Sequence, residues 1–353
     1  MRIEEADIYV CPATSGALRL EADRVENRSV LSGKLVGPDE ASYPITDGIP
    51  NFVFQQELPA SDVESLAYYE READNYDSWL PMITDTFGVD EVEIRTSMIS
   101  GLNLTQDSIV LETGCGTGRD SALIARQLGP YGKLYLQEIS PSMLRKAVDR
   151  MTGSSVPIEF AVANACYLPF PDNYFDACYH YGGLNTFGDV ARALREMTRV
   201  TKAGGKIVVG DEGVAPWLRA TEYGRVLLNA NPNYHYEPPL AALPAEARNV
   251  ALRWIIGAAF YVIDYEVGLG DPMANFDIEI PGPRGGTLRT RYYGGLEAVT
   301  PEAKELALRA RSRSGKSMHR WLSDVVSRAA REELVQAGGE DERVRPNDRS
   351  PDS

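Results

Sequence analysis

The stretch from residue 109 to residue 120 (IVLETGCGTGRD) constrains the fold of this chain more than any other. It opens with three consecutive apolar residues, which suit a strand that is buried on both faces of a sheet. Three glycines follow at alternate positions, and the segment from Arg119 to Leu128 then has the apolar period of a helix. This order is typical of the first unit of a nucleotide-binding α/β fold, because glycine lets the backbone turn sharply and lie against a ligand. A tight loop without a ligand has the same pattern, so the rest of the chain has to decide.

Strands and helices alternate after the glycine-rich turn. We expect strands at 134–139, 158–163, 175–181 and 206–210, and helices at 141–150 and 189–200. This alternation predicts an α/β fold, a doubly wound Rossmann-like parallel sheet with helices on both faces. Ligands of such sheets bind beyond the carboxyl ends of the strands. The residues at these ends are Glu112, Glu138, Asn164, His180, Tyr181, Asp211 and Glu212.

The segments on either side of this core are less regular. Residues 61–80 are predicted to form one helix, with Ser61 as N-cap and Glu64 completing a capping box, and a second helix covers about 89–101. After the fifth strand we expect a helix at 245–259 and a strand at 260–267, then a hairpin of 276–280 and 287–293 around the turn 281–286. The predicted parts are a β-rich arm (1–58), the core (59–213), an insertion that caps the site and holds the last strands (214–300), a C-terminal helix (301–336) and a charged, disordered tail (337–353).

The composition limits the kinds of partner. A formal net charge of −15 argues against a nucleic-acid substrate, because phosphate binding needs clustered Lys and Arg. No apolar run reaches the ~18 residues that span a bilayer, and the N-terminus lacks the cationic start and apolar core of a signal peptide. The four cysteines have no disulfide or metal-site spacing. We therefore expect a reduced, cytoplasmic protein that binds neither nucleic acid nor membrane, and whether it forms a homo-oligomer stays open.

The residues around the glycine-rich turn distinguish two kinds of nucleotide cofactor. In either kind, Glu138 would accept hydrogen bonds from the two ribose hydroxyls. A dinucleotide also needs its pyrophosphate at the helix N-terminus, usually with G-x-G-x-x-G spacing. Here the spacing is G-x-G-x-G, and Glu112 directly before the loop would repel a pyrophosphate. An anion there suits a ligand that carries an ammonium group, such as S-adenosylmethionine.

Four motifs in order between residues 111 and 209 resemble the class I S-adenosylmethionine-dependent methyltransferases. They are LETGCGTG (111–118), EISPSML (138–144), NACYLPFPDNYFD (164–176) and ALREMTRVTKAGGKIVV (193–209). The resemblance is strongest to the branch that contains the ubiquinone/menaquinone C-methyltransferases and many natural-product methyltransferases. It implies S-adenosylmethionine as cofactor, with Glu112 and the glycines at the methionine moiety, Glu138 at the ribose, and Ile139 and Met143 at the adenine.

The resemblance also assigns the remaining cofactor contacts. Asn164 stands where the family usually has an Asp that reads the adenine amino group. An Asn carbonyl still accepts that hydrogen bond, without the negative charge. The full predicted cofactor-binding set is Tyr69, Tyr76, Glu112, Thr113, Gly114, Cys115, Gly116, Gly118, Glu138, Ile139, Met143, Asn164, Ala165 and Tyr181.

The N-terminal arm resembles the small zinc-ribbon protein that activates methyltransferases. The matching residues are Cys11-Pro12, Gly16-Ala17-Leu18, Tyr43-Pro44-Ile45 and Asp47-Gly48-Ile49-Pro50. That family supplies four cysteines, but here Thr14 occupies the second cysteine position and no other cysteine precedes Cys115. One thiolate cannot hold a tetrahedral zinc site, so we expect no metal.

The acceptor of the methyl group is less constrained than the donor. Candidates for a catalytic group are His180, Glu212 and His235, and a structural role for His180 is an equal alternative. We expect transfer to a small organic molecule, a natural-product or quinone-like metabolite, bound in an apolar pocket of the insertion lined by Trp217, Tyr223, Tyr234, Tyr236, Trp254 and Tyr261. The alternatives are a tRNA or protein acceptor, suggested by the arm, and a non-catalytic module that binds the cofactor and regulates a partner. The methylated atom, O, N or C, stays open.

Overall fold

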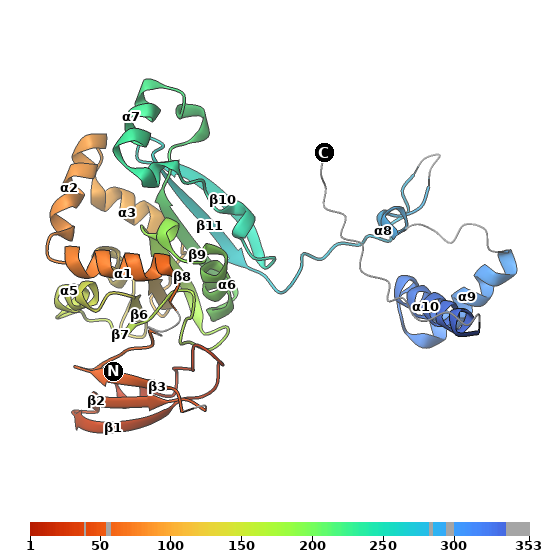
Figure 1. The fold of residues 1–353 in the computed structure, drawn as a ribbon, viewed down its shortest axis with the longest axis horizontal. Coiled ribbons are helices and arrows are strands. Elements are labelled where there is room, and N and C mark those ends of the chain that lie inside the picture. Colours follow the sequence, from red (N-terminus) through yellow and green to blue (C-terminus); the bar gives the residue numbers. More distant parts are fainter. Residues whose placement is uncertain (39, 54–57, 282–284, 294–299, 337–353) are drawn as a thin grey trace. The chain divides into compact units, whose positions relative to one another are not determined.

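The computed structural model describes residues 1–38, 40–53, 58–281, 285–293 and 300–336 (Figure 1). The chain divides after Pro272 into two compact units. This boundary falls inside the predicted insertion 214–300, and the first part of that insertion belongs to the same unit as the core. The predicted tail at 337–353, and residues 282–284 of the predicted turn, lie outside the described residues.

The first unit is built on a seven-stranded sheet with the order β10-β11-β9-β8-β5-β6-β7. Its strands are β5 (Ile109–Thr113), β6 (Lys133–Glu138), β7 (Ile158–Val162), β8 (Phe175–Tyr181), β9 (Thr201–Glu212), β10 (Ala247–Ile255) and β11 (Phe260–Val267). Strands β5 to β9 pair in parallel, whereas β11 runs antiparallel to β9 and β10 antiparallel to β11. The chain builds outward from β5 to β7 and then returns to β8 on the other side of β5. The predicted doubly wound fold is confirmed, with its switch point between β5 and β8.

Both faces of this sheet are covered by helices. On one face, α3 (Glu91–Ser100), α4 (Arg119–Ala125) and α5 (Pro141–Met151) pack on Val110 and its neighbours. On the other face, α6 (Val190–Val200) packs on Leu111 and its neighbours. Successive residues of a strand point to opposite faces, so a strand covered on both sides is apolar throughout. The run Ile109–Leu111 has this pattern for that reason.

Side chains at the helix starts fix where these helices begin. The hydroxyl of Ser140 accepts a hydrogen bond from the Met143 backbone N–H at 3.2 Å, and Pro141 occupies the first turn. Asp189 caps α6 in the same way, accepting from the Arg192 N–H at 2.8 Å. These caps bring the N-termini of the helices to the carboxyl ends of the strands before them.

The N-terminal arm is a four-stranded antiparallel sheet of β1 (Arg19–Glu26), β2 (Ser29–Val36), β3 (Ser42–Thr46) and β4 (Ile49–Pro50). Before β1, Val10 and Ala17 form an isolated antiparallel bridge. The arm joins the core through the Phe52 N–H, which donates to the carbonyl of Val162 on β7 at 2.7 Å, and through Tyr9, whose ring lies 5.5 Å from that of Phe170. The arm thus covers the β7 edge of the sheet.

Cys11 is buried in this arm. Its sulfur lies 3.2 Å from the Tyr43 hydroxyl, so it packs as a small apolar side chain with one weak hydrogen bond. Over the described ranges, no group of three or more His, Cys, Asp or Glu side chains is placed to hold a metal ion. The resemblance of the arm to the zinc-ribbon activator stays a prediction.

Two predicted helices differ from the structure. The helix expected at 61–80 is two helices, α1 (Ala60–Glu72) and α2 (Tyr76–Phe87), and the N-cap residue of α1 is Pro59 rather than Ser61. The helix expected at 245–259 is wrong, because this segment forms β10 and pairs with β11. The turn between them passes through residues 256–258, all with positive φ, and this left-handed turn is not visible in the apolar pattern. Residues 247–255 therefore form a strand, which pairs with β11.

The second unit, from Met273, is helical. The expected strand at 276–280 is irregular, and the one at 287–293 is instead α8 (Leu288–Tyr293). The single helix expected from residue 301 is divided into α9 (Pro301–Ser314) and α10 (Met318–Gln336), because Gly315 ends α9 with φ of +66°. Among the helices of the described residues, none combines the length and the apolar character needed to cross a membrane.

Candidate functional site

Two adjoining cavities open at the carboxyl ends of the strands. The first, called here the glycine-loop cavity, has a volume of about 90 Å³ and is bounded by the loop 114–117 and the ends of β6 and β8. The second, the aromatic cavity, has a volume of about 660 Å³ and extends between α1, α2 and the end of β9. Tyr69, Tyr76, Arg95 and Tyr181 line both cavities, so the two adjoin. This is the switch point at which ligands of doubly wound sheets bind.

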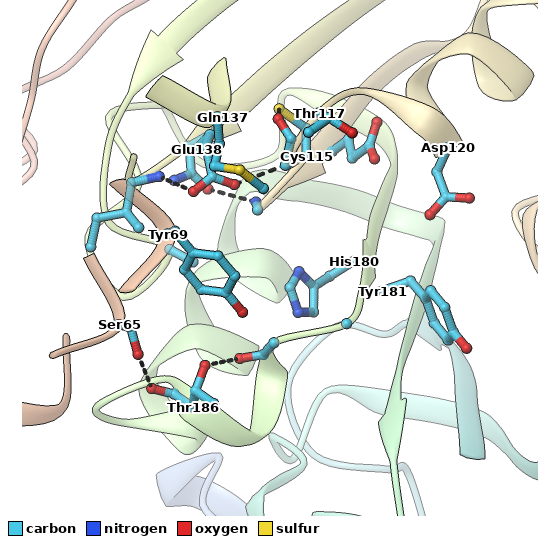
Figure 2. Close-up of a pocket in the computed structure, with 18 of the residues that line it drawn as sticks. Ser65, Tyr69, Cys115, Thr117, Asp120, Gln137, Glu138, His180, Tyr181 and Thr186 are labelled. Atoms are coloured by element: carbon cyan, nitrogen blue, oxygen red, sulfur yellow. Dashed lines mark hydrogen bonds between the residues drawn. The ribbon is translucent and has the colours of Figure 1, made fainter. Parts of the chain in front are cut away.

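Most of the residues predicted to bind a cofactor come together in the glycine-loop cavity (Figure 2). Its lining includes Tyr69, Tyr76, Glu112, Gly114, Cys115, Gly116, Glu138, Ile139, Met143, Asn164, Ala165 and Tyr181. Thr113 does not line it, and contributes its carbonyl to His180 instead. Gly118 does not line it either, because a Cβ there would lie 3.2 Å from Ala147, so this glycine serves the close packing of α4 on α5.

Glu138 organises the backbone of this cavity. One carboxylate oxygen accepts the Gly116 N–H at 2.9 Å, and the other accepts those of Ile139 at 2.9 Å and Ser140 at 3.0 Å. Burial raises the pKa of Glu138 above its ordinary value, and these three hydrogen bonds act in the opposite direction. A carboxylate has about four acceptor sites, so roughly one remains for a ligand hydroxyl.

Two buried carboxylates, Glu112 and Asp120, line the glycine-loop cavity. Glu112 is buried and accepts from the Ser121 hydroxyl at 2.5 Å, and its pKa is raised by burial and by the neighbouring carboxylate of Asp120. One oxygen of Asp120 pairs with Arg95 at 2.6 Å, but its Oδ1 has no hydrogen-bond partner among the described residues. A ligand that supplies N–H donors and positive charge fits this environment, whereas a pyrophosphate does not.

His180 is held in one tautomer by its backbone partner. Its Nδ1 lies 2.7 Å from the Thr113 carbonyl oxygen, which can only accept, so the proton is on Nδ1. Burial lowers the pKa of His180 to about 4, so the ring is neutral at pH 7. Its Nε2 is therefore a hydrogen-bond acceptor, and it has no partner among the described residues. Figure 2 shows the ring between Tyr69 and Tyr181.

Sequence reasoning missed Asp62, a buried residue of α1. One of its oxygens accepts from the Asn164 side-chain N–H at 2.7 Å, and the other from the Gly188 N–H at 2.7 Å. The Asn164 carbonyl oxygen in turn accepts from the Cys166 N–H at 2.8 Å. The charge that Asn164 lacks is thus supplied next to it by Asp62, which also lines the cavity. No local pattern could indicate this, because the two residues are 102 positions apart.

Two more carboxylates hold α1 and α2 over the cavity. Glu70 accepts from the Ser142 N–H at 2.8 Å and from the Ser140 hydroxyl, both at the N-terminus of α5. Asp77 accepts from the Thr117 hydroxyl at 2.7 Å and pairs with Arg150. These contacts place α1 and α2 against the glycine loop and the N-terminus of α5.

The aromatic cavity differs from the predicted pocket of the insertion. Its aromatic walls are Tyr68, Tyr69, Tyr76, Trp79, Tyr181 and Phe260, mostly from α1 and α2. None of the six aromatic residues predicted for the insertion lines it. Trp254 on β10 and Tyr261 on β11 pack against each other at 6.3 Å, and Trp217, Tyr223 and Tyr236 are exposed. The insertion contributes Phe260, Asn231, Asn233 and Ile256 instead.

The three predicted catalytic residues lie in different places. His180 lines the glycine-loop cavity, and Glu212 lines the aromatic cavity together with Asp211. His235 lines neither cavity, since it is exposed and its Nε2 lies 3.0 Å from the Leu228 carbonyl oxygen. The placement of His235 near the acceptor is therefore not supported.

Comparison with known proteins connects this geometry to a family. Residues 111–209 match a family model described as a methyltransferase domain. The ubiquinone/menaquinone biosynthesis C-methyltransferase UbiE of Bordetella parapertussis is 44% identical over 100 residues, which cover 28% of this chain and 39% of that protein. Its counterpart in Bordetella avium is 34% identical over 154 residues, which cover 39% of this chain and 58% of that protein. A solved structure of a methyltransferase from Aquifex aeolicus aligns with a TM-score of 0.38 and 16% identity, over 53% of this chain and 97% of that one.

These matches identify a domain of the chain, and they do not assign the activity of the whole protein. The chain spans less than two thirds of the length of either curated relative. The match over residues 111–209 nevertheless contains the glycine loop, Glu138 and the strand that carries His180. The chain therefore carries a class I S-adenosylmethionine-dependent methyltransferase domain, whose cofactor is S-adenosylmethionine.

Proposed function

We propose that this chain transfers a methyl group from S-adenosylmethionine to a small organic acceptor. The observation that carries the proposal is the pairing of two adjoining cavities, one lined by the cofactor motifs of the family and one of about 660 Å³ beside it. Small-molecule sites have volumes of this size and mostly apolar walls. The curated relatives are named as quinone C-methyltransferases, so a quinone-like metabolite is one candidate acceptor.

The residues of the glycine-loop cavity would bind S-adenosylmethionine through its N–H and O–H groups and through its positive charge. S-adenosylmethionine supplies a methyl group already activated by a sulfonium. Glu138 would accept from a ribose hydroxyl with its remaining site, and the free oxygen of Asp120 would accept from the ammonium group. The Asp62–Asn164 pair would present a carboxylate to the adenine end of the cavity.

His180 would orient the acceptor. With the proton fixed on Nδ1, its Nε2 can only accept, so it suits an O–H or N–H of the molecule that is methylated. The low pKa of His180, about 4, makes the ring a weak base, and orientation is the role that fits it. Positioning alone can supply much of the acceleration when the donor is already activated.

The experiment is a screen of acceptors with the full chain and S-adenosylmethionine, scored by release of S-adenosylhomocysteine and by the mass of the product. Quinols, phenols, amines, tRNA and a protein extract form the arms. Turnover with a small molecule supports the proposal. Turnover only with tRNA or protein contradicts the acceptor class, and binding of the cofactor without turnover in any arm favours a regulatory module.

A further inference from the structure

Two carboxylates at the end of β9 stand in the aromatic cavity without a cation beside them. Asp211 accepts the backbone N–H of Asn185 at 2.6 Å and that of Glu212 at 2.8 Å. Glu212 accepts from the side chains of Asn231 and Asn233. Within the described part of the chain, neither carboxylate forms an ion pair, although Glu212 is only partly exposed and Asp211 is buried.

The charge of the cavity lining is therefore unbalanced. Its cation among the described residues is Arg95, and this guanidinium is already paired with Asp120 at 2.6 Å and Glu91 at 2.7 Å. Burial and the neighbouring Glu212 raise the pKa of Asp211 to about 7, as expected for two like charges held together away from water. A bound cation would relieve both the desolvation and the repulsion.

A second observation points to a ligand that donates hydrogen bonds. His180 lies on β8, the strand next to β9, and its Nε2 is a buried acceptor without a partner among the described residues. Gly182 and Gly183, two and three residues further along, line both cavities. The unpaired His180 Nε2, in the glycine-loop cavity, and the carboxylates of Asp211 and Glu212, in the aromatic cavity, are all acceptors.

The aromatic side chains that line this cavity also favour a positively charged ligand. Tyr69 lies with its ring 5.3 Å from that of Tyr68 and 6.1 Å from that of Tyr76, in edge-to-face geometry. Trp79 lines the same space and is 59% exposed. Aromatic faces attract a cationic nitrogen, and Trp does so most strongly. Phe260 and Ile83 complete an apolar surface for the rest of a ligand.

We propose that the aromatic cavity binds a cationic amine, with the charged nitrogen at Glu212 and Asp211 and an apolar or aromatic body against Tyr69 and Trp79. This inference rests on the proposed function, since it names the class of acceptor for that site. It excludes acceptors that would place a carboxylate or phosphate in this cavity, because no unpaired cation of its described lining could receive one.

The test compares three probes with the same ring. They are 2-(2-naphthyl)ethylamine, 2-(2-naphthyl)ethanol and 3-(2-naphthyl)propanoate, which are cationic, neutral and anionic at pH 7.5. Binding to the full chain is measured by calorimetry, with and without S-adenosylhomocysteine. We expect the amine to bind at least about tenfold more tightly than the alcohol, since charge-assisted contacts are worth that much, and the propanoate to bind more weakly than both.

Single substitutions test whether the charge of Glu212 causes the preference for the amine. Glu212→Gln keeps the shape and removes the charge, and should weaken amine binding about tenfold or more while changing alcohol binding less than about threefold. Glu93→Gln, on the exposed side of α3, is the control for net charge and should change neither. If Glu212→Gln fails to fold, Trp79→Ala on the partly exposed wall should weaken amine binding more than alcohol binding.

The outcomes separate this inference from the proposed function. Equal or tighter binding of the propanoate, equal losses for amine and alcohol in Glu212→Gln, or no binding of any probe would overturn the amine assignment. Methyl transfer to a neutral or anionic molecule would overturn it as well and leave the methyltransferase proposal intact. Failure to bind S-adenosylhomocysteine, with amine selectivity preserved, would overturn the proposed function and leave the amine site standing.

Discussion

Replacing Glu138 tests how the glycine loop is held and whether the loop binds the cofactor. In Glu138→Ala, the backbone N–H groups of Gly116, Ile139 and Ser140 lose their acceptor. A buried donor left without a partner costs about 1–3 kcal/mol, and hydrogen bonds to a charged group are at the upper end. The side chain is fully buried and its pKa is raised by burial, so removing it also relieves a desolvation cost. We expect a net loss of about 2–4 kcal/mol in the free energy of unfolding.

The matched variant is Glu138→Gln. Its amide oxygen can still serve the Ile139 and Ser140 N–H groups, but its amide nitrogen then faces the Gly116 N–H. One backbone N–H is then left without an acceptor, instead of three, so we expect the free energy of unfolding to fall by about 1–2 kcal/mol. Unfolding in urea, followed by circular dichroism, measures both values.

Cofactor affinity is the second measurement on the same variants. If Glu138 also accepts from the ribose, Glu138→Ala should weaken S-adenosylmethionine binding by roughly 1.5–3 kcal/mol, as measured by calorimetry. A loss of stability with unchanged affinity would limit Glu138 to shaping the loop. Unchanged stability and unchanged affinity would refute the reasoning altogether.

Three further predictions address metal, pH and the α1 contact. The full chain should contain no stoichiometric zinc by elemental analysis, and a chelator should leave its melting temperature unchanged, because Cys11 contacts Tyr43 rather than other metal ligands. The pKa of His180 is lowered to about 4 in the folded chain but is near 6.5 when unfolded, so the unfolded state binds the extra proton between these values. Stability should therefore be full above about pH 6.5 and fall toward pH 4, and His180→Gln should flatten this part of the profile; an equally steep profile in the variant would contradict it. Asp62→Asn should lower the free energy of unfolding by about 1–3 kcal/mol, because an amide cannot accept from both Asn164 and Gly188, and no change in urea unfolding would show that α1 is held otherwise.

Local patterns in the sequence predict the core and its cofactor loop. The run before Glu112 is apolar because both faces of β5 are covered, and Ser140 is a cap whose partner is only three residues away. Such features depend on neighbours along the chain, so they can be identified without a structure. The same reasoning found Glu138, whose three partners lie in the loop and the turn that it predicted.

The failures have a common physical cause, contacts between distant segments. Residues 247–255 form a strand because β11 pairs with them through a left-handed turn, which overrides their helical pattern. Asp62 belongs to the site because α1 brings it to Asn164 and Gly188, more than 100 residues further along the chain, and Tyr68 on α1 and Trp79 on α2 line the aromatic cavity. The sequence therefore predicted more of the residues that line the glycine-loop cavity than of those that line the aromatic cavity.

The choice of cofactor is the central claim, and one titration tests it most directly. S-adenosylhomocysteine and NAD are titrated separately into the full chain in a calorimeter, together with the variant Gly114→Ala, in which a Cβ would lie 3.0 Å from the His180 ring at a φ of +59°. The account predicts one site for S-adenosylhomocysteine, no measurable binding of NAD, and at least tenfold weaker binding in the variant, because the added methyl crowds the loop. Binding of NAD in preference to S-adenosylhomocysteine, or no binding of S-adenosylhomocysteine at all, would contradict it.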